Sequence, residues 1–274
     1  MGRLPRWTLV VVATLGVVTT GSFTASASST RGGVVDVLYA GSLTNVMTNH
    51  LIPAFTRATG IRVVSVSNGS SALASEIRGK TQVGDVFLSA AASSDRELQG
   101  ASNGNWVTTY TTFASSPLVL AYNPQSPFAG ALRTRPWYEV VTRAGFLLGR
   151  TDPATDPKGV LAIEALREAA ARYHLPQLAR LTRVHDGVFD ETALVGELEA
   201  GQLDAGFFYE VEARAANLPT RPLTGTRLEG TYTVAVLNRA PHLTAARAFR
   251  SYLLSNAGRA LLRAYGLTPT PLTP

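Results

Sequence analysis

The sequence predicts an α/β fold of two lobes, each built on a mixed, mostly parallel sheet and joined by two crossover strands. Residues 34–89 alternate strand-like and helix-like segments, which is typical of a parallel sheet covered by helices. A second α/β segment occupies the middle of the chain. Two strand-like apolar runs, Pro117–Tyr122 and Thr231–Leu237, lie at its ends, as expected of strands that connect two lobes.

The first strand is expected at Val34–Tyr39, because these residues are mostly β-branched and apolar. A helix follows, with apolar residues at helical spacing up to Ala58 and with Gly60 as its end. Pro53 lies inside this helix and should bend or break it. The next elements are predicted as a strand, a helix and a strand at residues 61–66, 71–78 and 83–89.

The middle segment predicts a second set of strands and helices. Strands are expected at residues 146–150 and 203–209, and helices at 160–173 and 191–198. Helices over residues 245–265 then return to the first lobe. The predicted boundaries are 28–116 and 232–274 for the first lobe and 117–231 for the second.

The N-terminus has the pattern of a signal peptide over residues 1–27. Arg3 and Arg6 precede an apolar run at Thr8–Val18, and an A-x-A cleavage signal ends at Ala27. The run is short for a membrane span, and no later run reaches that length. We therefore expect an exported protein, periplasmic or secreted, without a membrane span after cleavage. Loss of the two arginines would change the formal charge from +6 to +4.

Composition excludes several functions. The 45% hydrophobic and 16% charged content is that of a globular chain, and the arginines are scattered rather than clustered, so no nucleic-acid partner is expected. The chain has no cysteine, which excludes disulfides, thiol catalysis, cysteine-ligated zinc and a lipid anchor on cysteine. We expect a monomer without a cofactor.

Three polar turns each lead from a strand into a helix. They contain Gly41-Ser42, Ser70 with its neighbours, and Asp156-Pro157. Such turns lie at the carboxyl ends of strands, where α/β sheets bind ligands, and helix N-termini favour anions. Ser and Asp are also the commonest helix N-caps, so each turn taken alone has an ordinary structural explanation.

Enzymatic alternatives find little support in the residues. Neither Gly-Ser turn has the G-x-S-x-G elbow of a serine hydrolase, and the four histidines are scattered. No phosphate-binding loop or dinucleotide motif is present. The segment "TDPATDPKG" lacks the Glu that ends a calcium loop. We therefore expect a protein that is not an enzyme, with a secreted hydrolase as the weakest alternative.

As a set, the motifs "YAGSLTNVM", "SNGSSALASEIRGK", "GDVFLSA", "DPATDPKG" and "LDAGFFYEVEA" resemble those of periplasmic molybdate/tungstate-binding proteins of ABC importers. The resemblance extends over roughly residues 34–266. It implies a type II periplasmic binding fold, a molybdate or tungstate ligand in the interlobe cleft, and an ABC permease as partner. A receptor for sulfate, phosphate, ferric ion or an organic anion, and a protein that only binds other proteins, remain alternatives.

The resemblance also implies site residues. The hydroxyl groups of Ser42 and Ser70 would donate to the oxyanion from the first lobe, and Asp156 and Tyr209 would join from the second. The archaeal-type branch of the family has a second carboxylate near this strand. Phe208 stands at its place here, so Glu210 is a weaker candidate, and Glu212 weaker still.

Asp156 raises an electrostatic problem, because a carboxylate beside a dianion is repelled. The carboxyl group could carry a proton and donate a hydrogen bond. Alternatively, its oxygen could be a direct ligand of Mo or W, which accept more than four ligands where sulfur does not. The third explanation is that Asp156 only caps its helix.

Overall fold

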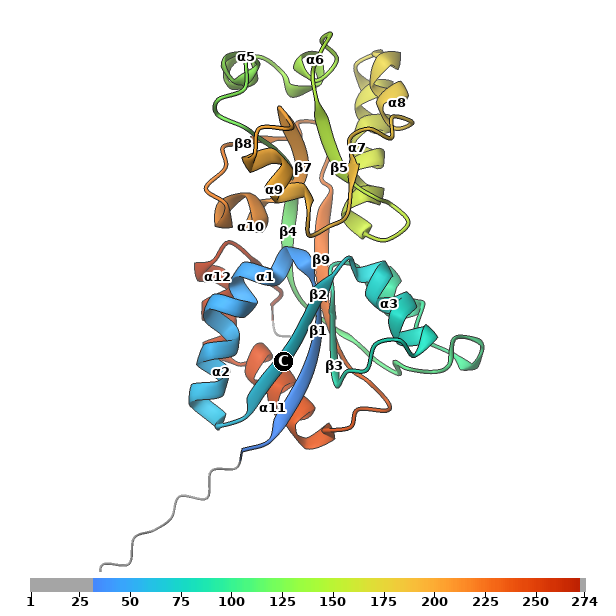
Figure 1. Cartoon of the computed structure of the whole chain (residues 1–274), viewed down its shortest axis with the longest axis vertical. Helices are drawn as coiled ribbons and strands as arrows, with labels where there is room; N and C mark the ends of the chain where they lie inside the picture. The colour runs from blue at the N-terminus through green and yellow to red at the C-terminus, as the bar shows by residue number, and fades with distance from the viewer. Residues whose placement is uncertain (1–31, 272–274) are drawn as a thin grey trace, which may run out of the picture. The chain divides into compact units, whose positions relative to one another are not determined.

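The computed structural model describes residues 32–271 (Figure 1). Its strands follow the order β2-β1-β3-β9-β4-β7-β5-β6, with β8 and β10 also pairing with β4. The predicted signal peptide lies outside the described residues. Within them, no helix is long and apolar enough to cross a membrane. The strands are β1 Val34–Ala40, β2 Arg62–Asn68, β3 Val86–Ser89, β4 Thr111–Tyr122, β5 Leu148–Thr151, β6 Val188–Phe189, β7 Ala205–Tyr209, β8 Thr220–Pro222, β9 Glu229–Val236 and β10 Thr268–Pro269.

Helices cover the strands in both lobes (Figure 1). Those before β4 are α1 Thr44–Val46, α2 Ile52–Thr59, α3 Ser70–Gly79 and α4 Ala92–Arg96, with shorter turns at η1 Gly41–Leu43, η2 Met47–Leu51 and η3 Ala101–Asn103. The later ones are α5 Ala129–Thr134, α6 Trp137–Val140, α7 Pro157–Arg172, α8 Pro176–Leu181, α9 Leu194–Glu199, α10 Glu210–Ala215, α11 Leu243–Leu254 and α12 Asn256–Ala264.

Strands β4 and β9 are the two crossover strands, and they run between the two groups of elements in Figure 1. β9 pairs antiparallel with β3 in the first lobe and with β4. β4 pairs with β9 as far as Pro117 and with β7 of the second lobe from Leu118 onward. The two-lobed α/β fold expected from the sequence is confirmed, while the exact lobe boundaries stay a prediction.

The expected start of β4 at Pro117 is wrong, because the strand begins six residues earlier, at Thr111. Proline usually stands at a strand's edge or start, since it has no N–H for the ladder. Here Pro117 lies inside β4, where the strand changes partner from β9 to β7. A missing donor at that position interrupts neither ladder.

The helical path does not end at Pro53, but its hydrogen bonding changes just before this residue. The chain forms a π-helical turn at Met47–Leu51, and α2 then begins at Ile52, so Pro53 occupies the first turn of α2. The first turn is where a missing backbone N–H costs least. Gly60 ends α2 in the left-handed conformation with φ 73°. On the buried side of α2, the Phe55 ring packs against Phe249 of α11 with centroids 5.1 Å apart, which brings the C-terminal helices back to the first lobe.

Candidate functional site

All three turns singled out from the sequence connect a strand to a helix and are buried. Ser42 follows β1 and is 6% exposed; Ser70 follows β2 and is 0% exposed. Asp156 follows β5, is 2% exposed and is the N-cap of α7. The parallel pairing of β1 with β2 puts the first two turns at the same edge of the sheet.

Neither serine caps its helix, which corrects that interpretation. The cap positions are Ala40 and Gly69, and no side-chain cap bond forms at either. The Ser42 hydroxyl oxygen accepts a hydrogen bond from the Tyr232 hydroxyl at 3.0 Å. The Ser70 hydroxyl oxygen accepts one from the backbone N–H of Ala90 at 3.0 Å. Because both oxygens accept within the protein, each serine keeps its own O–H proton for another acceptor.

Asp156 is a helix cap, but only one of its oxygens does this work. Its Oδ1 accepts from the backbone N–H of Lys158 at 3.1 Å. Its Oδ2 is buried and has no hydrogen-bond partner among the described residues. Buried polar atoms are rarely left unpaired, so this oxygen marks a place for a ligand or a water molecule.

The Tyr209 hydroxyl is the second unpaired group of the cleft. Tyr209 is 0% exposed, and its hydroxyl has no partner within residues 32–271. Burial, followed by the nearby Asp156 carboxylate, raises the pKa of Tyr209 well above its usual value. The hydroxyl therefore stays protonated and remains a donor. Tyr232 packs edge-on against Tyr209, with ring centroids 5.9 Å apart, and links it to Ser42.

The two lobes touch across these turns, so the cleft is closed. The backbone N–H of Ala72 in α3 donates to the carbonyl of Thr155 at 3.0 Å. Gly69 lies so close to this carbonyl that a Cβ atom there would stand 2.4 Å from its oxygen. At Gly41 a Cβ atom would stand 1.4 Å from Oε2 of Glu191. Glycine at these two positions permits the close approach of the second lobe.

The sequence analysis missed a buried ionic group, which we call the Lys158 cluster: Lys158, Glu191 and Glu212. The Lys158 Nζ lies 2.5 Å from Oε1 of Glu212 and 3.3 Å from Oε1 of Glu191. The Nζ also lies 5.5 Å from the centroid of the Phe208 ring, which stands where the related branch has a carboxylate. One signal was available: the chain has only two lysines, and one follows the Asp156-Pro157 turn.

Burial and the neighbouring charges shift the pKa values of this cluster in opposite directions. Burial alone would lower the pKa of Lys158, but Glu212 and Glu191 together raise it above its usual value. Burial raises the pKa of Glu191 to about 8, despite the opposing effect of Lys158. Burial also raises the pKa of Glu212, which Lys158 opposes in the same way. Glu212 is held further by the backbone N–H of Tyr209, which donates to its Oε2 at 2.8 Å.

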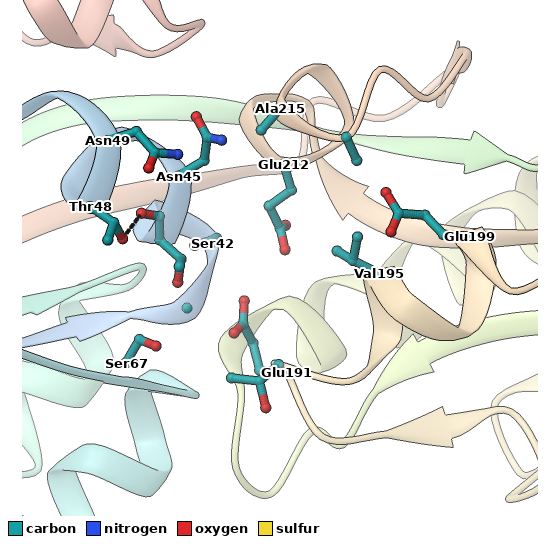
Figure 2. A pocket seen from close by; sticks show the side chains of 14 residues that line it. Ser42, Asn45, Thr48, Asn49, Ser67, Glu191, Val195, Glu199, Glu212 and Ala215 are labelled. Carbon is teal, nitrogen blue, oxygen red and sulfur yellow. Dashed lines mark hydrogen bonds between the residues drawn. The ribbon is translucent and has the colours of Figure 1, made fainter.

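Glu210 does not join the site, contrary to expectation. Glu210 was expected at the end of a strand, but it is the first residue of α10. Successive side chains there are arranged around a helix instead of alternating between the two faces of a sheet. The Glu210 side chain is 35% exposed and pairs with Arg214 one turn later, at 3.5 Å. Glu212, two residues on, faces the cleft in its place (Figure 2).

A cavity of ≈ 610 Å³ opens beside these buried residues (Figure 2). Residues of η1, α1 and η2 form one wall, and residues between Glu191 and Ala216 form the other. Ser42 lines this cavity, as does Glu212, the weakest of the sequence candidates. Ser70, Asp156 and Tyr209 are buried and do not line it. The labelled lining residues in Figure 2 are Ser42, Asn45, Thr48, Asn49, Ser67, Glu191, Val195, Glu199, Glu212 and Ala215.

A cleft between two α/β lobes joined by two strands defines a periplasmic-type solute-binding protein. The chain belongs to the family described as bacterial extracellular solute-binding protein, whose model matches residues 35–268. Members of this family are transport proteins rather than enzymes, and they work with the permeases of ABC transporters.

Three of the relatives have names that include a ligand, and two of these are WtpA proteins. A Haloferax volcanii protein, provisionally named an ABC transporter molybdenum-binding protein, is 32% identical over 216 residues, covering 76% of this chain and 67% of the relative. The molybdate/tungstate-binding protein WtpA of Pyrococcus abyssi is 25% identical over 211 residues, covering 58% of this chain and 61% of the relative.

Solved structures support the fold. The sulfate-binding protein SubI from Mycobacterium tuberculosis superposes with a TM-score of 0.71 at 16% identity, covering 87% of each chain. The periplasmic molybdate-binding protein of Azotobacter vinelandii gives a TM-score of 0.67 at 19% identity, covering 87% of this chain and 100% of that one. At these identities the similarity concerns the fold alone.

Proposed function

We propose that the protein is an extracytoplasmic receptor that captures molybdate or tungstate between its lobes and delivers it to the permease of an ABC importer. The observation that carries this proposal is a set of unused hydrogen-bonding groups in the closed cleft. Ser42 and Ser70 keep their O–H protons, the Tyr209 hydroxyl is a buried donor without an acceptor, and Oδ2 of Asp156 is unpaired.

An oxyanion satisfies these groups better than other small ligands do. Three hydroxyl donors suit its oxygens and add no charge. The first residues of α3, Ser70 and Ser71, have backbone N–H groups without an intrahelical acceptor, and the positive end of the helix dipole lies there. Molybdate and tungstate are the oxyanions named for two of the relatives, both called WtpA.

The protonation state of Asp156 determines whether this site would discriminate against sulfate. A protonated Asp156 would donate to any of these oxyanions. An ionised Asp156 would repel a dianion unless its oxygen became a direct ligand of the metal. Mo and W accept such a ligand and sulfur does not, so the second arrangement rejects sulfate.

Binding proceeds by closure in this proposal. The oxyanion first meets Ser42 and Ser70 on the first lobe. Rotation about β4 and β9 then brings Asp156 and Tyr209 onto it from the second lobe. A ligand that bridges both lobes stabilises the closed form, because the open form lacks half of its contacts.

The same cleft raises a second candidate, a ferric ion receptor. Asp156, Glu191, Glu212, Tyr209 and Tyr232 are all buried against a single lysine, and such oxygen groups bind cations. The raised pKa of both tyrosines weighs against this candidate, since burial keeps them as neutral donors rather than anionic ligands.

Calorimetric titration of the purified protein with tungstate, molybdate, sulfate and ferric citrate tests the proposal. We expect tungstate and molybdate to bind, and to stabilise the fold by about 2.7 kcal/mol at a concentration of 100 times Kd. Sulfate should bind more weakly than either. Binding of ferric citrate alone, or of none of the four, would contradict the proposal.

A further inference from the structure

The Lys158 cluster has more acidic side chains than basic ones. Lys158 faces Glu191 and Glu212, and Asp156 caps the same helix two residues earlier. With every group ionised, one positive charge stands against three negative ones in a buried site. A dianion entering this cleft would add two more negative charges. Uncompensated buried charge is costly, so one carboxyl group must become neutral.

Contacts within the cluster indicate which group this is. Glu212 has a close partner for each carboxylate oxygen: Lys158 Nζ at 2.5 Å and the backbone N–H of Tyr209 at 2.8 Å. Both contacts stabilise its ionised form. Glu191 has one long contact with Lys158, at 3.3 Å, and its other oxygen lies against Gly41 of the first lobe.

We propose that Glu191 is a specificity-determining residue of the cleft: its carboxyl group carries a proton when an oxyanion is bound, and donates that proton in a hydrogen bond toward the ligand. This inference rests on the proposed function and extends it. Glu191 reaches the Gly41-Ser42 turn from the second lobe, so the donor arrives as the lobes close. The proton comes from solvent and returns to solvent when the oxyanion is released.

The groups that face Glu191 support this assignment. From the first lobe, Gly41 and Ser42 offer no charge that could neutralise it. Within residues 32–271, the ionisable groups near Glu191 come from other elements, and Lys158 is the only cation among them. They are Lys158 and Asp156 of α7 and its cap, Glu212 of α10, Tyr209 of β7, and Tyr232 of β9. The pKa of Glu191, which burial raises to about 8, places its proton loss within an accessible range.

The proton restricts the class of ligand. A carboxylic O–H needs an acceptor, which a fully deprotonated oxyanion supplies on every oxygen. A cation would instead expel the proton from Glu191 to gain a charged ligand. Binding of an oxyanion therefore takes up a proton at alkaline pH, whereas binding of a cation releases one. The sign of the proton count thus reports the class of ligand.

Titration calorimetry with sodium tungstate, in pairs of buffers that differ in ionisation enthalpy, measures this count. We expect almost no proton uptake at pH 6.5 and an uptake approaching one proton per tungstate at pH 9. Above pH 8 the affinity should fall by up to about tenfold per pH unit, because the free protein is then ionised at Glu191. Glu191→Gln should remove both effects, because its amide is neutral at every pH.

Glu199→Gln is the matched control, because Glu199 lines the same cavity without contacting Lys158. It should retain the proton uptake of the unchanged protein. Tungstate binding with equal uptake in Glu191→Gln, or with proton release, overturns the inference and leaves the receptor function standing. Absence of binding by tungstate, molybdate and sulfate at every pH overturns the proposed function and this inference with it.

Discussion

At the scale of single residues, the two oxygens of Asp156 have different tasks. Oδ1 caps α7, and Oδ2 is unpaired beside the cleft. The motif resemblance and the capping explanation are therefore compatible, because one side chain has an oxygen for each. An asparagine would keep the cap, while an alanine would lose both contributions.

Asp156→Asn should consequently separate ligand binding from folding. We expect tungstate affinity to fall by at least about tenfold where the carboxylate is a direct metal ligand, because an amide cannot replace it. A role of Asp156 as a protonated donor predicts little change, because the asparagine amide also donates. Unfolding stability should change by less than about 0.5 kcal/mol, since Asn caps helices as well as Asp does. Calorimetry and urea unfolding measure the two effects. Unchanged tungstate affinity would contradict a direct bond between Asp156 and the metal.

Glu191 should also affect the ligand-free protein. Its folded-state pKa of about 8 lies above the usual value of 4.5, so the folded form holds the proton more tightly. The protonated Glu191 contributes fully to the free energy of unfolding below pH 4.5. This contribution is lost as pH rises to about 8, by at most about 1.4 kcal/mol per pH unit. Urea unfolding at several pH values should show a shallower decline for Glu191→Gln. An identical decline would contradict the assignment.

At the scale of elements, the local sequence pattern predicts a helix or strand correctly where the residues of that element alone determine its conformation. The strand β1 follows from its β-branched residues, and the end of α2 follows from the left-handed cap at Gly60. The change of helix type before Pro53 accompanies its missing N–H. The early start of β4 could not be predicted, because pairing with the distant strands β9 and β10 makes the residues before Pro117 part of a strand.

The same distinction applies to the site. The burial of Ser42, Ser70 and Asp156 in strand-to-helix turns was predictable, because each turn has a recognisable pattern. Their role in binding stays a prediction. The pairing of Lys158 with Glu191 and Glu212 joins residues 33 and 54 positions apart, and no local pattern contains it. Glu210 was misplaced because the helix α10 begins directly after β7, which turns Glu212 inward instead.

The packing of α2 on α11 predicts the stability of the first lobe. Phe55 is 0% exposed and touches the rings of Phe249 and Tyr252. Phe55→Ala should lower the free energy of unfolding by about 3–5 kcal/mol, because it removes a buried ring and leaves a cavity. Chemical denaturation measures this loss. A loss below about 1 kcal/mol would mean that the helices do not depend on this contact. Phe146 of the second lobe, which is partly exposed, provides a comparison.

At the scale of the whole molecule, closure is what brings the site together. Ser42 and Ser70 belong to the first lobe, Asp156 and Tyr209 to the second, and the crossover strands β4 and β9 connect them. Neither lobe alone carries all four of these residues. Under the proposed function, selectivity for the ligand would depend on the closed arrangement, in which Gly41 and Gly69 allow the lobes to meet.

The burial of Lys158 has a consequence for chemical reactivity. The chain has two lysines: Lys80 is exposed, and Lys158 is buried with its amine held by two glutamates. An amine-acylating reagent should modify Lys80 at least about tenfold faster, because Lys158 reacts only after the cluster opens. Tungstate should slow the second reaction and leave the first unchanged, as peptide mass spectrometry would measure. Equal protection of both lysines would contradict this. The protein thus contains its own probe of lobe opening and its own internal reference.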